Sequence, residues 1–244
     1  MWRDSAILWE VRLMEKMPDL ERELRPRLEI LGNEIIISLK KRSRYRQNLD
    51  IYQPGLVLEH ANLSLLEYEL GKMEQVHAEL GRYTYADQEA FTDVSKARLV
   101  IKRPAPPCPI HNFPTGLGSE IIQYYIQWVK KSCQPDTDSD TFGETVTADV
   151  AALLNIYERI TLGKYVAEKK YLMNPEGFKN AKGAAAIEEL LVDKEREARV
   201  IETAIHLAEH YQFDAEQAKE IFGWLIDMTV RVQVQYILKR AQKR

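Results

Sequence analysis

Apolar residues recur at intervals of three and four along most of the chain, which is the spacing of one face of an α-helix. The pattern occupies the segments 24–43, 64–83, 118–132, 147–172, 184–211 and 214–240. Ser119 and Thr147 stand where helix N-caps are expected, and Asp214 with Gln217 resembles a capping box. No segment carries a reliable strand or hairpin signal. We therefore predict an all-α fold, a single-chain bundle of about nine to twelve helices.

The segment 228–240, MTVRVQVQYILKR, alternates polar and apolar residues in the manner of a half-buried strand. A strand at this place would stand alone in a helical context, without a partner. On a helix, its apolar residues form one stripe, and Thr229 and Gln233 lie one turn apart on a shared face. We therefore predict a helix.

The most evident break in the helical pattern is RPAPPCPIHNFPTG, residues 103–116, which holds five of the 10 prolines. Proline lacks an N–H donor and fixes φ, so this segment is excluded from helix interiors and central strands. It divides one domain, residues 1–244, into an N-terminal half (1–102) and a C-terminal half (117–244). A second polar break covers residues 133–144.

The composition excludes some classes of partner. The net charge is −3 and no basic patch dominates, so we expect no nucleic acid partner. No stretch approaches the roughly 18 apolar residues of a membrane span, so we expect no membrane partner. Residues 1–11 lack the features of a signal peptide. Cys108 and Cys133 form no CxxC motif, so we expect no metal site, and whether they form a disulfide stays open.

Four of the predicted helices carry polar residues beside their apolar stripes: Arg25, Arg159 and Lys170, then Asp193, Arg196 and Glu197, then Thr229 and Gln233. Each of these alone is typical of a solvated surface. Arg159 and Lys170 are close to three helical turns apart, however, and their shared face adjoins apolar residues. Buried cations need anions, so a convergence of these residues would require a small ligand with more than one carboxylate.

The segment RITLGKYVAEKKYL, residues 159–172, resembles the signature helix of the all-helical chorismate mutases of fungi and plants. The segments ELRPRLEILGNEIIISLKKRS, FGETVTADVAALLNIYERI and MTVRVQVQYILKR resemble other helices of that family, in the same order. The resemblance implies a helical architecture that arose by duplication of the smaller bacterial mutases. It also implies an isomerase that converts chorismate to prephenate by a Claisen rearrangement, without a cofactor, in Phe and Tyr biosynthesis. A cytoplasmic homodimer is expected, although secretion is not excluded.

The resemblance assigns catalytic roles to five residues. Arg25 and Arg159 fall on arginines that hold the two substrate carboxylates. Lys170 falls on the lysine that donates hydrogen bonds to the ether oxygen and to a carboxylate, and Gln233 occupies the position that donates to the ether oxygen. Glu197 falls on the glutamate that positions the ring hydroxyl.

Three further residues fall on substrate-binding positions. Asp193 occupies a hydroxyl-contacting position, Thr229 lies near a carboxylate, and Arg196 resembles an active-site arginine of the bacterial enzymes. Pro26 could displace Arg25, in which case Arg22 or Arg27 would take its place.

Two places depart from the fungal pattern. Gln233 replaces a glutamate that must be protonated to donate a hydrogen bond, so activity is expected to stay nearly constant from mildly acid to neutral pH. The candidate effector-binding residues are Arg82, where the fungal enzymes have consecutive arginines, and Gly143 and Glu144, where they have Gly-Ser. Because Glu144 would repel an amino-acid carboxylate, we expect weak or absent control by Tyr or Trp.

Two alternative functions stay open from the sequence. One is a catalytically silent relative that acts as a helical regulatory or interaction protein. The other is a different chorismate- or isochorismate-using enzyme on the same scaffold.

Overall fold

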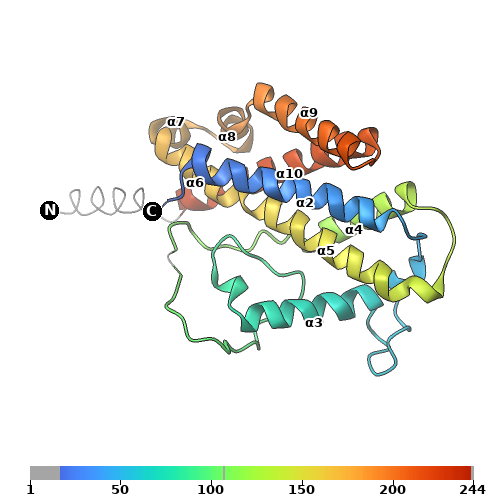
Figure 1. Cartoon of the computed structure of the whole chain (residues 1–244). Coiled ribbons are helices and arrows are strands. Elements are labelled where there is room, and N and C mark those ends of the chain that lie inside the picture. Colours follow the sequence, from blue (N-terminus) through green and yellow to red (C-terminus); the bar gives the residue numbers. More distant parts are fainter. Residues whose placement is uncertain (1–16, 107, 243–244) are drawn as a thin grey trace.

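A computed structural model describes residues 17–106 and 108–242, so the stretch 1–11 considered for a signal peptide lies outside it (Figure 1). The regular elements in these two ranges are helices and short helical turns, accompanied by isolated β-bridges, which confirms the predicted all-α class. None of these helices has both the length and the apolar character that crossing a membrane requires.

The elements follow one another along the chain in this order: η1 (Leu20–Leu24), α2 (Arg25–Arg42), η2 (Leu49–Tyr52), α3 (Leu65–Glu79), η3 (Arg82–Thr84), α4 (Gly118–Ser132), η4 (Ser139–Thr141), α5 (Phe142–Thr161), α6 (Gly163–Met173), α7 (Pro175–Asn180), α8 (Ala184–Leu191), α9 (Lys194–His210) and α10 (Ala215–Gln242).

Helices α2 and α5 lie side by side through the middle of the molecule and run in opposite directions (Figure 1). Helix α3 packs on the other side of α5, and α10 packs against α5, α6, α8 and α9. A fully buried ion pair joins α2 to α5, with Arg42 Nε 2.6 Å from Asp149 Oδ1. The hydroxyls of Tyr52 and Tyr125 each donate to the same carboxylate at 2.8 Å. These bonds satisfy a charge that would otherwise be costly to bury.

The buried apolar residues form two clusters, and α10 contributes to both of them. Met228 and Val232 belong to the cluster between α2, α4, α5 and α9, whereas Tyr236 and Ile237 belong to the cluster around α6, α7 and α8. The segment 228–240 is therefore helical, as predicted, and Asp214 Oδ1 accepts from Gln217 N at 2.9 Å in the predicted N-cap. The sequence predicted one apolar stripe on this helix. Other helices cover α10 on more than one side, so its buried surface is wider than that stripe.

Two of the predicted helices are broken in the structure. The segment 147–172 divides at Leu162 into α5 and α6, and the segment 184–211 divides at residues 192–193 into α8 and α9. The predicted N-caps at Ser119 and Thr147 are wrong, because α4 begins at Gly118 and α5 begins at Phe142. The first break falls directly before Gly163, whereas the second carries no proline or glycine that would mark it locally.

The proline-rich segment 103–116 contains neither helix nor strand in its described residues, and the irregular backbone covers residues 85–106 and 108–117. A buried lysine of α6 holds this region: Lys164 Nζ donates to Glu89 Oε1 at 2.6 Å, to Phe113 O at 2.9 Å and to Ala86 O at 3.1 Å. Glu89 also accepts from the backbone N–H of Thr115. Lys164 thus attaches the long irregular connection to the helical core.

We expect Lys164→Met to lower the free energy of unfolding by about 3–5 kcal/mol, because it leaves the Glu89 carboxylate without its partner in a largely buried place. Urea denaturation measures the change. Lys102→Met, at an exposed position of the same irregular region, serves as the control and should unfold like the parent chain. An equal loss in both variants would contradict the role given to Lys164.

Candidate active site

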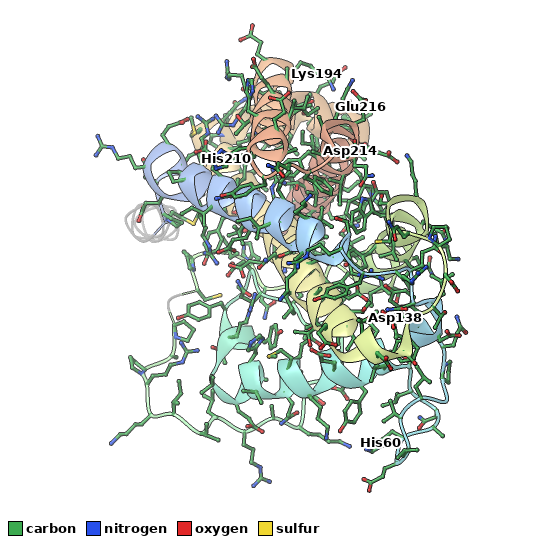
Figure 2. The ribbon with its side chains drawn as sticks, turned by 45° about the vertical axis from the view of Figure 1, so that its right-hand side comes forward. His60, Asp138, Lys194, His210, Asp214 and Glu216 are labelled. Atoms are coloured by element: carbon green, nitrogen blue, oxygen red, sulfur yellow. The ribbon has the colours of Figure 1, made fainter. Side chains whose placement is uncertain are left out.

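The structure brings all eight polar residues singled out in the sequence to one pocket, which is lined by Arg25, Arg159, Lys170, Asp193, Arg196, Glu197, Thr229 and Gln233. Apolar residues complete its walls: Leu20, Leu28, Val166, Leu191, Val200, Ile226 and Val230. The polar set comes from α2, α5, α6, α9 and α10, together with the connection before α9. Figure 2 shows α9, which runs from Lys194 to His210, beside the start of α10 at Asp214 and Glu216.

A glycine allows α6 to approach α10 closely enough for both to face the pocket. A Cβ atom on Gly163 would lie 3.1 Å from both Cγ2 and the carbonyl oxygen of Thr229, which is tighter than nine in ten real Cβ contacts. Only glycine therefore fits this crossing without displacement. The crossing brings Lys170, two turns further along α6, to the same pocket as Gln233.

Arg159 is a buried cation without a counter-ion. The residue is 6% exposed, its guanidinium lies 5.4 Å from the centre of the Phe222 ring, and it forms no ion pair with any described residue. Its Nε also has no hydrogen-bond partner there. Burial lowers the pKa of Arg159 to about 10, so the group stays charged at neutral pH. An isolated buried cation is unfavourable, and an anion bound in the pocket would relieve it.

The side-chain amide of Gln233 is also incompletely bonded. The residue is 6% exposed, and its Oε1 has no donor among the residues described. The amide carries an acceptor oxygen at one end and a donor NH2 group at the other. In either orientation the group retains hydrogen-bonding capacity for a ligand.

Lys170 faces the pocket from α6, and its ammonium donates to the carbonyl oxygen of Leu191. Burial lowers the pKa of Lys170, and the nearby Asp193 carboxylate opposes that effect. Asp193 itself caps α9, with its Oδ1 accepting from Arg196 N at 3.0 Å. Glu197 Oε2 lies 3.2 Å from Nζ of the exposed Lys194. The aspartate therefore fixes where α9 begins and so where Arg196 and Glu197 lie.

Interactions with nearby residues orient the side chains of Thr229 and Arg25. The Thr229 hydroxyl donates to Leu225 O at 2.6 Å, so it must rotate before it can donate to a ligand. Arg25 begins α2, pairs with Glu21 and lines the pocket. Arg27 turns away to pair with Glu158 at 2.7 Å. Pro26 is thus accommodated in the first turn of α2 and does not remove Arg25 from the pocket.

The candidate effector residues are divided between two other pockets of the chain. Arg82 donates to Glu158 Oε2 at 2.5 Å and to Gln88 Oε1 at 3.0 Å. Gly143 and Glu144 lie in the first turn of α5, beside a different hollow. Within one chain they do not form a joint site.

The two cysteines do not pair. Cys108 is exposed, whereas Cys133 is buried against Arg42, and both are free thiols. Among the described residues, no group of three or more His, Cys, Asp or Glu side chains is arranged to hold a metal ion.

Sequence reasoning missed Arg199. It lines a second cavity that shares Arg25, Arg159 and Arg196 with the pocket. Arg196 and Arg199 are three residues apart on α9 and so share a face, which is the only signal that could have pointed to it.

Comparison with known proteins gives consistent results. Residues 143–234 match the family described as Chorismate mutase type II. The chain is 33% identical over 227 residues to the chorismate mutase of Schizosaccharomyces pombe, which covers 84% of this chain and 90% of that protein. It is 27% identical over 232 residues to chorismate mutase 1 of Petunia hybrida, covering 85% and 72%. The crystal structure of the Candida albicans chorismate mutase with L-Trp has the same fold, with a TM-score of 0.84, 23% identity and 92% of each chain covered.

Proposed function

The chain belongs to the chorismate mutase family, and we propose that its pocket converts chorismate to prephenate as a step in Phe and Tyr biosynthesis. The observation that carries the proposal is the buried Arg159, a cation without a counter-ion among the described residues, on the wall of a pocket that is lined by further cations. Such a pocket suits a dianion. Chorismate carries two carboxylates, and its conversion to prephenate is an isomerisation in which no atom is gained or lost.

Binding selects the reactive shape of the substrate. Arg25 and Arg159 come from different helices and line the same pocket, so each can take one carboxylate. Holding both carboxylates brings the enolpyruvyl arm over the ring, where the carbon atoms that will bond lie close together. The pocket therefore binds a conformer that is rare in free chorismate. The reaction is faster because the reacting atoms are held close together and correctly oriented.

Charge stabilisation lowers the barrier of the bond exchange. The ether C–O bond breaks as the new C–C bond forms, and negative charge grows on the ether oxygen in the transition state. Lys170 and Gln233 are the donors proposed to face that oxygen, already in place before the reaction. The exchange is concerted within one molecule, so it requires no general base and no nucleophile.

The remaining polar residues are proposed to hold the rest of the substrate. Glu197 and Asp193 lie at the start of α9 and can accept from the ring hydroxyl. Arg196 and Thr229 are proposed to contact carboxylate oxygens, the threonine after its hydroxyl leaves the Leu225 carbonyl.

Incubation of the purified chain with chorismate tests the proposal directly. Loss of chorismate with stoichiometric formation of prephenate supports it. Unchanged chorismate would favour the catalytically silent alternative, and a different product would favour another chorismate- or isochorismate-using enzyme.

The pH dependence of the rate tests Gln233. A neutral amide donates a hydrogen bond at any pH, so we expect the parent kcat to change little between mildly acid and neutral pH. In the Gln233→Glu variant the introduced carboxyl can donate only while protonated, so its kcat should fall as the pH rises through its pKa. Parallel pH profiles for the two proteins would remove Gln233 from the ether oxygen.

We propose weak or absent control by Tyr or Trp. Arg82 is engaged by Glu158, and Glu144 adds a negative charge where an amino-acid carboxylate would have to approach. Initial rates should therefore stay within about twofold when either amino acid is added at millimolar concentration, an effect below about 0.4 kcal/mol. Strong inhibition by Tyr would overturn this expectation.

We also propose a homodimer located in the cytoplasm. Both statements rest on the family resemblance. Light scattering of the purified chain measures the mass in solution and tests the first of them.

A further inference from the structure

A second cavity adjoins the active-site pocket between α2 and α9. The two share Arg25, Leu28, Arg159, Arg196 and Val200 in their walls, so the two cavities are neighbours. The second cavity adds Glu29 from α2 and Arg199 and Thr203 from α9. These three residues are exposed at the surface, and we call them the mouth of the pocket.

The charges along this path are mostly positive. Arg199 and Arg196 form no ion pair with residues in the described ranges, and Glu29 is the acidic group that the mouth contributes. These charged groups affect one another. Burial lowers the pKa of Arg25, and the nearby positive charges of Arg196 and Arg199 lower it further. Burial lowers the pKa of Arg196, the Glu29 carboxylate opposes that effect, and the Arg199 charge adds to it. Several arginine charges thus lie near one another at the mouth, and the Glu29 carboxylate offsets them only in part.

The positive mouth contrasts with the whole molecule. The chain has a net charge of −3, so at long range it repels a dianion. A local patch of opposite sign at the entrance can reverse that repulsion and raise the rate and strength of capture. Arg199 is exposed at the entrance and does not line the inner pocket. It can act before the substrate reaches Arg25 and Arg159.

We propose that Arg199 is a substrate-capture residue, which draws the dianion into the mouth and delivers it to Arg25 and Arg159 without touching the reacting atoms. Glu29, on the facing helix, weakens this attraction. The inference rests on the proposed function, since it takes chorismate as the dianion. Arg199 and Glu29 both lie outside the inner pocket, and they have opposite effects on the capture of the dianion.

The kinetic test compares Arg199→Gln with the parent chain at low and high ionic strength. At about 10 mM salt the variant should show a KM raised about three- to tenfold with an unchanged kcat. At about 0.5 M salt the two proteins should converge, because ions screen exposed charges at that distance. Arg199→Lys keeps the charge and should restore most of the low-salt KM.

Two control variants make the result specific. Glu29→Gln removes the opposing charge at the mouth and should lower the KM at low salt, the reverse of Arg199→Gln. Arg44→Gln removes an exposed charge just beyond the far end of α2 and should leave the KM unchanged. Calorimetric binding of prephenate, which is also a dianion, provides a readout that does not need turnover and should show the same order of affinities.

Two outcomes would overturn the proposal. One is a lower kcat with an unaltered salt dependence, which would place Arg199 at the substrate or in the fold. The other is identical KM and prephenate affinity for the parent and Arg199→Gln at all salt concentrations. A parent chain that binds prephenate with the expected salt dependence but does not turn over chorismate would contradict the proposed function and leave the capture role supported.

Discussion

Replacing Arg159 with methionine is expected to lower kcat/KM for chorismate by about a thousandfold, which corresponds to about 4 kcal/mol of lost transition-state stabilisation. The guanidinium is buried, lines the pocket and has no counter-ion in the part of the chain that the structure describes. A carboxylate that loses this partner is left unpaired in a largely buried place. Steady-state kinetics with chorismate measure the effect.

The same substitution should raise the stability of the chain without ligand. An unpaired cation beside Phe222 costs free energy, and methionine fills similar space without that cost. We therefore expect Arg159→Met to unfold at higher urea concentration than the parent while it loses activity. A variant that unfolds more easily and retains a near-normal rate would contradict both the environment and the role given to Arg159.

Lys170→Met is expected to lower kcat by about a hundred- to a thousandfold, because one of the two proposed donors to the ether oxygen disappears. The loss should appear mainly in kcat, since the charge on that oxygen develops only in the transition state. Single-turnover rates at saturating chorismate separate this effect from binding.

The neighbouring lysine provides a matched control for that experiment. Lys169 precedes Lys170 on α6 but does not line the pocket. Lys169→Met changes the same kind of side chain on the same helix, so its kcat should stay close to that of the parent. Equal losses in both variants would show that the effect comes from α6 as a whole and not from a donor in the pocket.

The sequence predicted the helical class and the C-terminal helix because their signals are local. Periodicity and the Asp214 cap are contained within a few residues. The interruptions at Leu162 and Asp193 have a different origin. The first accompanies the close crossing of α6 over α10 at Gly163, and the second lies within a run of strong helix formers. The first depends on a packing partner that is distant in the sequence, Thr229, whereas the second coincides with the local cap that Asp193 provides to α9.

The candidate site could be predicted only through the resemblance. Spacing alone placed Arg159 and Lys170 on one face, and it could not distinguish an inward face from a solvated one. Arg199 escaped because an exposed arginine on an amphipathic helix is indistinguishable from an ordinary surface charge. The pairing of Lys164 with Glu89 was equally hidden, since 75 residues separate the partners.

Helix α10 contributes to both apolar clusters, and it is the last of the described helices to be synthesised. A nascent chain therefore exposes two incomplete cores until residues 215–242 leave the ribosome. Chain elongation at about 5–20 residues per second leaves that surface open for seconds. We expect ribosome-bound chains arrested before residue 215 to be sensitive to protease and to bind chaperones, and protection to appear in a single step once the final helix emerges.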